Sequence, residues 1–254
     1  MTSDIARLPL AGGGAIAWRR LEGQGPEIVF LCGLRSDMEG SKALFLEDWC
    51  RREARAFTRF DYRGHGSSTG RFEDGCIGDW LADTLAVLDR VVQGRFVLVG
   101  SSMGGWLAVL AGLARQERLA GIVGIAAAPD FTADLMEARL SQTQRAQLAE
   151  NGFLEEPSPY GEPLKITRRL LEDGRRHRVL EGPIPLRCPV HLLQGQEDPD
   201  VPWKTALKLA ARLESQAITV ELIKDGDHRL SRDTDLRRLA AAVERVLEQA
   251  AAAG

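Results

Sequence analysis

The chain has 254 residues, of which 44% are hydrophobic and 27% charged, and its formal net charge is −3. This length allows a large buried core, and the composition is that of an ordinary globular protein. Because neither basic nor acidic residues are in strong excess, we expect neither nucleic acid nor an anionic membrane as the main partner.

Strand-like apolar runs alternate with helix-like segments over the first half of the chain. Residues 5–20 predict a hairpin that turns at Gly12-Gly13-Gly14, and the glycine-rich residues 23–26 then break the chain. The alternation predicts the α/β class, with a mostly parallel central sheet and helices on both faces. The expected strands are residues 27–31, 56–62, 96–99 and 119–127, and the expected helices are residues 41–52, 79–92 and 106–114.

Residues 130–188 interrupt this alternation. They contain helical patches at 132–151 and 164–173 and several prolines, so we expect a helical cap laid over the strand ends. The core then resumes, with strands at 190–195 and 217–223 and helices at 203–213 and 233–252. This organisation predicts a core made of residues 1–129 and 189–254 and a cap made of residues 130–188.

The most specific motif is Gly100-Ser101-Ser102-Met103-Gly104, a Gly-x-Ser-x-Gly sequence between a buried strand and an apolar helix. At such a turn the serine backbone is strained, and the hydroxyl projects above the end of the sheet. Gly100 and Gly104 leave room for the bend, and the helix N-terminus supplies N–H groups. We therefore predict Ser102 as a catalytic nucleophile; an incidental serine in a glycine-rich connection is the alternative.

A serine nucleophile needs a base, usually a histidine that a carboxylate orients. Of the four histidines, His228 follows the last expected strand, and active groups gather at the carboxyl ends of parallel strands. We therefore predict His228 as the base. We expect His65 to brace its glycine-rich turn, His177 to lie on a solvated basic face, and His191 to make a structural hydrogen bond.

The acid is expected between the serine and the histidine in sequence, at the end of a strand. Residues 196–202 follow the strand that begins at residue 190 and offer three carboxylates. We predict Asp198 as the acid, with Asp200 as the closest rival and Glu197 as an exposed residue.

The oxyanion hole needs two N–H donors. One is expected from Met103, the residue after the nucleophile. The second is expected from Leu34, because Gly33 allows the loop after the first core strand to aim that N–H group.

The four cysteines, Cys32, Cys50, Cys76 and Cys188, show no C-x-x-C pair and no metal-ligand spacing. They predict free thiols in a reducing compartment, with neither a metal nor a cofactor. The first ten residues hold no apolar leader, and no apolar run approaches ~18 residues. We therefore expect no signal peptide, no mitochondrial presequence and no membrane span, and a cytoplasmic location.

Taken together, these residues resemble the α/β-hydrolase superfamily over nearly the whole chain, and the order Ser102, Asp198, His228 is that of its members. The resemblance is strongest to a branch of mitochondrial palmitoyl-protein thioesterases and acyl-glucuronide esterases. It implies an α/β-hydrolase fold and a catalytic triad of the three residues above. The segments that carry the resemblance are residues 33–43, 60–64, 99–106, 201–203 and 227–229.

The motifs and the resemblance predict a serine hydrolase that cleaves a small-molecule carboxylic ester or thioester. An acyltransferase or a peptidase with the same triad is an alternative, and so is a non-catalytic binding protein. Basic cap residues predict either attraction of anionic substrates or a solvated helix face: Lys165, Arg168, Arg169, Arg175, Arg176 and Arg178. Apolar cap residues are expected to line an acyl pocket or to pack the cap onto the core: Phe131, Leu135, Met136, Leu140, Leu148, Phe153 and Leu154.

Overall fold

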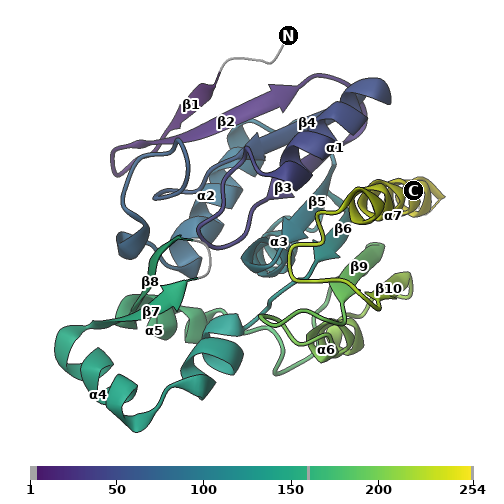
Figure 1. The fold of residues 1–254 in the computed structure, drawn as a ribbon. Coiled ribbons are helices and arrows are strands. Elements are labelled where there is room, and N and C mark those ends of the chain that lie inside the picture. The colour runs from purple at the N-terminus through teal and green to yellow at the C-terminus, as the bar shows by residue number, and fades with distance from the viewer. Residues whose placement is uncertain (1–4, 159–160, 253–254) are drawn as a thin grey trace.

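An eight-stranded sheet runs through the centre of the molecule (Figure 1). The computed structural model describes residues 5–158 and 161–252. The strand order is β1-β2-β4-β3-β5-β6-β9-β10; the six strands from β4 onward are parallel, and β1 and β2 pair antiparallel. The strands are β1 (Ala6–Pro9), β2 (Ala15–Leu21), β3 (Gln24–Leu31), β4 (Arg55–Phe60), β5 (Phe96–Ser101), β6 (Leu119–Ile125), β9 (Val190–Gly195) and β10 (Ile218–Ile223).

Helices cover both faces of this sheet, which confirms the predicted class (Figure 1). On one face α1 (Ser41–Arg52) contacts α7 (Asp233–Ala252), and on the other α2 (Ile77–Arg90) contacts α3 (Met103–Ala114). The helix α6 (Lys204–Arg212) packs on β9 and β10. Because all six parallel strands point the same way, the loops after them meet at one edge of the sheet.

The apolar patterns place most elements within a few residues of their observed bounds. Every residue of β5 is buried, as expected for a strand between two layers of helices. The helix α2 begins two residues earlier than expected, and its buried face includes Ile77, Trp80 and Val87, whereas Leu81 and Leu85 are only partly buried. Most of the glycine-rich break expected at residues 23–26 lies within β3, which begins at Gln24 and whose pairing register with β4 shifts between Gln24 and Ile28.

The expectation of a wholly helical insertion is wrong. Two strands, β7 (Phe153–Ser158) and β8 (Gly161–Thr167), pair antiparallel between α4 (Gln142–Asn151) and α5 (Arg168–Arg176). The helical patch expected at 164–173 therefore begins as a strand, and the helix starts only after Thr167. The Thr167 hydroxyl accepts the Leu170 N–H and caps α5. The patch expected at 132–151 is likewise divided into a π-helical turn (Thr132–Met136), a 3₁₀ turn (Glu137–Arg139) and α4.

Prolines in this segment explain why the sequence does not predict the hairpin. Pro157 and Pro163 lie within its strands, and a two-stranded ribbon tolerates proline because each strand has one edge without a partner. The insertion has a small apolar cluster of its own, formed by Leu140, Leu154, Ile166 and Leu171. This cluster supports the division into a core and a cap of residues 130–188, which stays a prediction.

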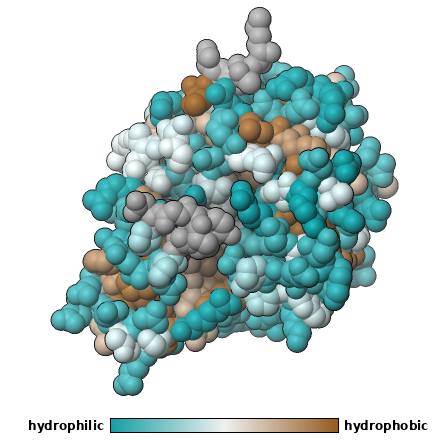
Figure 2. Space-filling view, viewed as in Figure 1, coloured by the Kyte–Doolittle hydropathy of each residue, from teal (hydrophilic) through white to brown (hydrophobic). Residues whose placement is uncertain are grey.

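One face of the molecule is largely hydrophilic, with small apolar areas between polar ones (Figure 2). The exposed large apolar side chains in the described ranges are Ile5, Leu44 and Leu207. Within residues 5–158 and 161–252, no helix combines the length and the apolar character needed to cross a membrane.

Candidate active site

Ser102 lies at a sharp turn between β5 and α3. Its backbone has φ 52° and ψ −118°, a left-handed conformation that a residue with a Cβ atom rarely adopts. The turn is held from both sides, since the Ser102 N–H donates to the Ile125 carbonyl at 2.9 Å and the Ser102 carbonyl accepts the Ala128 N–H at 3.1 Å. The strain is thus balanced by hydrogen bonds to β6 and to the residues that follow it.

Two glycines make the turn sterically possible. A Cβ atom on Gly104 would lie 2.1 Å from the Leu31 carbonyl oxygen, and one on Gly100 would lie 2.2 Å from the Gly104 carbonyl oxygen. The first turn of α3 therefore packs directly on the backbone at the end of β3. This close approach also brings the loop after β3 beside the serine, and a Cβ atom on Gly33 would lie 3.4 Å from the Ser102 Cβ.

His228 reaches Ser102 from the loop after β10. Its Nε2 lies 3.2 Å from Ser102 Oγ, and its Nδ1 lies 2.8 Å from Asp198 Oδ2. The loop packs on the residues after β9, where the Glu197 N–H donates to the Gly226 carbonyl at 2.9 Å. The three side chains predicted as nucleophile, base and acid therefore form one hydrogen-bonded chain.

Asp198 is enclosed by hydrogen-bond donors. Besides His228, the Gln194 side-chain amide donates to Oδ2 at 3.0 Å, and the backbone N–H groups of Asp200 and Val201 donate to Oδ1 at 2.9 and 2.8 Å. Burial by itself would raise the pKa of Asp198, but the hydrogen bonds from His228 and from the backbone outweigh it, so the pKa is lowered. The carboxylate is therefore ionised at neutral pH.

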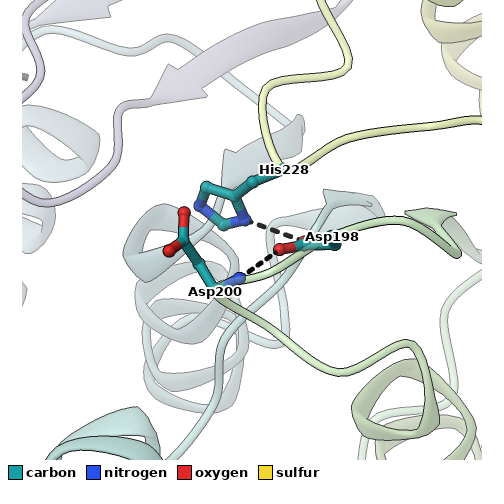
Figure 3. A group of neighbouring side chains, drawn as sticks. All are labelled: Asp198, Asp200 and His228. Atoms are coloured by element: carbon teal, nitrogen blue, oxygen red, sulfur yellow. Dashed lines mark hydrogen bonds and ion pairs between the residues drawn. The ribbon is translucent and has the colours of Figure 1, made fainter. Parts of the chain in front are cut away.

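The alternative acids and the other histidines lie outside this hydrogen-bonded chain. Asp200 and Glu197 are exposed, and Asp200 serves Asp198 through its backbone N–H (Figure 3). His177 is a quarter exposed and lies 3.6 Å from Asp173, so it is less solvated than the expected basic face. His191 is buried on β9, and its Nε2 lies 3.5 Å from Glu221 Oε2 on β10, a contact that agrees with its expected structural role.

His65 braces more than its own turn. Its Nε2 accepts the Arg35 N–H at 3.2 Å, and its Nδ1 lies 3.2 Å from the Arg63 carbonyl, which places the proton on Nδ1. Arg35 has a left-handed φ of 55° and directly follows Leu34, one of the two predicted oxyanion donors. Met103, the other, is the first residue of α3, where N–H groups have no acceptor within the helix. His65 thus fixes the loop that carries Leu34.

The side chains of Asp198, Asp200 and His228 place oxygen and nitrogen atoms within 4.8 Å of one another, close enough for all three to bind one metal ion (Figure 3). However, Nδ1 of the histidine and both oxygens of Asp198 are already used in hydrogen bonds with each other and with neighbouring donors. A metal would have to displace these bonds. The donor set therefore fits a hydrogen-bonded chain with the serine better than a cation.

The insertion contacts the core close to this site. The Arg35 guanidinium donates to the Pro163 carbonyl of β8 at 3.0 Å, and the Trp106 indole of α3 donates to the His177 carbonyl at 3.1 Å. The Phe131 ring packs edge-on against Trp106, with ring centroids 5.6 Å apart. The cap is thus tied both to the loop that carries Leu34, called here the Leu34 loop, and to the helix that follows Ser102.

Several cap cations have carboxylate partners. Arg169 pairs with Asp79 of α2 at 2.8 Å, Arg175 pairs with Glu137, and Arg178 pairs with Glu181 at 2.7 Å. These pairs reduce the positive charge that the sequence alone attributes to the cap, so attraction of anionic substrates stays a prediction with less support. Four of the apolar residues proposed for an acyl pocket pack instead within the cap's own cluster: Met136, Leu140, Leu148 and Leu154.

Comparison with known proteins agrees with this geometry. Residues 28–242 match the model of the alpha/beta hydrolase family. The chain belongs to the α/β-hydrolase family. It is 37% identical over 236 residues to mouse palmitoyl-protein thioesterase ABHD10, mitochondrial, which covers 92% of this chain and 79% of that protein, and 34% identical to the human protein.

Solved structures of the family are closely similar. The mouse ABHD10 structure superposes with a TM-score of 0.90 at 35% identity, covering 97% of this chain and 99% of that one. A hydrolase of Agrobacterium vitis superposes with a TM-score of 0.92 at 43% identity, covering 96% and 100%. The family and the thioesterase relatives together support a hydrolase activity for this chain.

The comparison corrects the expected location. The mammalian relatives carry mitochondrial names, which contradicts the cytoplasmic assignment. That assignment depended on the expected lack of a leader and of a membrane span, and on scattered cysteines, all four of which are free in the structure. Free cysteines indicate a reducing compartment, and this condition does not single out the cytoplasm.

The sequence did not reveal every residue that supports the site. The sequence predicts only a strand at Gln194, whereas its buried amide donates to Asp198 and to the Val201 carbonyl. The available signal was a polar residue at the carboxyl end of an otherwise apolar strand. The Arg35 contact with His65 had no comparable signal, because it joins two separate loops.

Proposed function

We propose that the chain is a serine hydrolase that cleaves carboxylic esters or thioesters through an acyl-enzyme on Ser102. The observation that carries this proposal is the continuous chain from Asp198 through His228 to Ser102, with contacts of 2.8 and 3.2 Å. The palmitoyl-protein thioesterase relatives support an acyl substrate, and we take a long-chain acyl thioester as the first substrate to test.

The first half-reaction forms the acyl-enzyme. Nε2 of His228 accepts the Ser102 proton while Oγ attacks the carbonyl carbon of the substrate. The Asp198 carboxylate accepts the Nδ1–H and stabilises the positive charge that develops on the imidazole. The imidazolium then gives its proton to the leaving alcohol or thiol, and the acyl group remains on the serine.

The tetrahedral intermediate carries a negative oxygen that needs fixed donors. We assign this role to the N–H groups of Met103 and Leu34, on the two segments that Gly104 and Gly33 bring together. In the second half-reaction His228 takes a proton from the water that attacks the acyl-enzyme. The bond between Oγ and the acyl carbon then breaks, His228 returns the proton to Ser102 Oγ, and the acid is released. Since the same donors stabilise both intermediates, one oxyanion hole serves both steps.

The proposal is tested by fluorophosphonate labelling and intact-protein mass spectrometry. We expect one adduct on the wild-type protein, no adduct on Ser102→Ala, and an unchanged adduct on Ser101→Ala, the adjacent serine. Ser102→Ala should also abolish turnover of p-nitrophenyl esters and of acyl thioesters of graded length. A folded wild-type protein without an adduct would move the function to binding, and efficient transfer to added alcohols would indicate an acyltransferase.

A further inference from the structure

A lysine from α1 contacts the loop that carries His228, although the two lie far apart in sequence. Lys42 Nζ donates to the Arg229 carbonyl at 2.6 Å and to the Ser231 hydroxyl at 3.3 Å. The Ser231 hydroxyl itself donates to the same carbonyl at 3.0 Å. The ammonium therefore binds the carbonyl of the residue directly after His228.

The other anchors of this loop lie on different sides. The Gly226 carbonyl accepts the Glu197 N–H after β9, and the Asp227 carboxylate accepts the Leu230 N–H within the loop. Arg232 links the end of the loop to α7 through Asp235, at 2.8 Å. Lys42 adds the link to α1, whose N-terminus follows the Leu34 loop by only a few residues.

The Lys42 amine is sensitive to its surroundings. Burial lowers its pKa to about 8, and the nearby Arg229 charge adds to this effect. The groups that oppose the lowering are Asp227 in the same loop and Asp235 at the start of α7. At neutral pH the amine is still mostly charged, and it loses its charge as the pH rises through about 8.

We infer that Lys42 is a positioning residue, which holds the His228 loop in register with Ser102 and the Leu34 loop. This inference rests on the proposed function. The Lys42 ammonium makes a charge-assisted hydrogen bond next to the base, so it restricts where Nε2 can lie relative to Oγ. Because a displacement of about 1 Å at a reacting group costs roughly 10²-fold in rate, we expect loss of Lys42 to lower kcat rather than to raise KM.

The test compares Lys42→Met, Lys42→Arg and the control Lys224→Met, which removes an exposed lysine before the same loop. Ester hydrolysis is measured from pH 6.5 to 10, together with the rate of fluorophosphonate labelling and the Tm. We expect Lys42→Met to lose about 10- to 100-fold in kcat at pH 7, with little change in KM. Lys224→Met should match the wild type.

The pH profile separates positioning from general structural support. In the wild type kcat should fall above about pH 8, as Lys42 loses its charge. In Lys42→Arg the rate should persist to higher pH, since a guanidinium stays charged. Lys42→Met should keep the wild-type Tm at pH 7, because it also removes the cost of burying a charge.

Three results would overturn the inference. The first is that Lys42→Met has the same kcat and labelling rate as the wild type. The second is that the Tm of Lys42→Met falls in proportion to its rate. The third is a kcat that declines above pH 8 in Lys42→Arg as it does in the wild type. If Lys42→Met does not fold, this third comparison is the deciding test. Absence of labelling in the wild type would instead refute the proposed function.

Discussion

Asp198 and Asp200 are separated by one proline, yet their carboxylates have opposite surroundings. The Asp198 side chain is fully buried and contacts the Nδ1 of His228, whereas Asp200 is exposed. The lowered pKa of Asp198 keeps this acceptor ionised at neutral pH. An ionised acceptor holds the histidine proton on Nδ1, which leaves Nε2 free to accept the serine proton.

Exchange of each aspartate for asparagine should separate these roles. Asp198→Asn places an amide beside Nδ1, which favours the wrong tautomer, and we expect kcat to fall by roughly 10³- to 10⁴-fold. Asp200→Asn keeps the backbone N–H that binds Asp198 and should change kcat by less than about threefold, the effect of ±0.5 kcal/mol typical of surface changes. Steady-state ester hydrolysis checks both, and the reverse ranking would assign the acid to Asp200.

At the level of helices and strands, elements specified by a local residue pattern could be predicted from the sequence, whereas the pairing of β7 with β8 could not. The turn at Ser102 is specified by five consecutive residues, so its strand and helix were both found. The hairpin of β7 and β8 depends on pairing between Phe153 and Thr167 at opposite ends of a proline-containing segment. Residues 164–173 have apolar spacing that suits a helix, and only the pairing with β7 makes residues 164–167 part of β8.

The turn at Ser102 offers a sharp steric test. Gly104→Ala places a Cβ atom 2.1 Å from the Leu31 carbonyl oxygen, a backbone atom that cannot move independently. We expect a loss of about 1–3 kcal/mol in the free energy of unfolding and loss of fluorophosphonate labelling. The control is Gly182→Ala, whose Cβ atom would meet nothing within 4 Å. Urea unfolding should leave that control unchanged; equal stability of the two variants would contradict the close packing.

At the scale of the whole molecule, sheet topology explains why the main site residues could be predicted from sequence. Ser102 and His228 are 126 residues apart, but both follow parallel strands, whose carboxyl ends meet at one edge of the sheet. The contacts that support them follow no such rule. Lys42 reaches Arg229 across 187 residues and Arg35 reaches Pro163 across 128, from a helix and from a loop. Such contacts depend on how layers pack, which residue spacing does not encode.

The stability of the whole fold should depend on pH through His65, which is buried among the rings of Tyr62, Phe72 and Trp80. Burial lowers its pKa to about 4, below the ordinary value of about 6.5. Between these values the unfolded chain binds more protons, so the free energy of unfolding falls as the pH drops. From pH 7.5 to pH 5 this loss is about 2 kcal/mol, since each pKa unit corresponds to about 1.4 kcal/mol.

The test is urea unfolding of the wild type and of His65→Gln at both pH values. The carboxylates are common to both proteins, so their contribution to the change in the free energy of unfolding cancels in the comparison. Glutamine keeps an acceptor for the Arg35 N–H but does not titrate, so its stability should fall less on acidification, whereas equal falls would show that His65 is not the group that titrates.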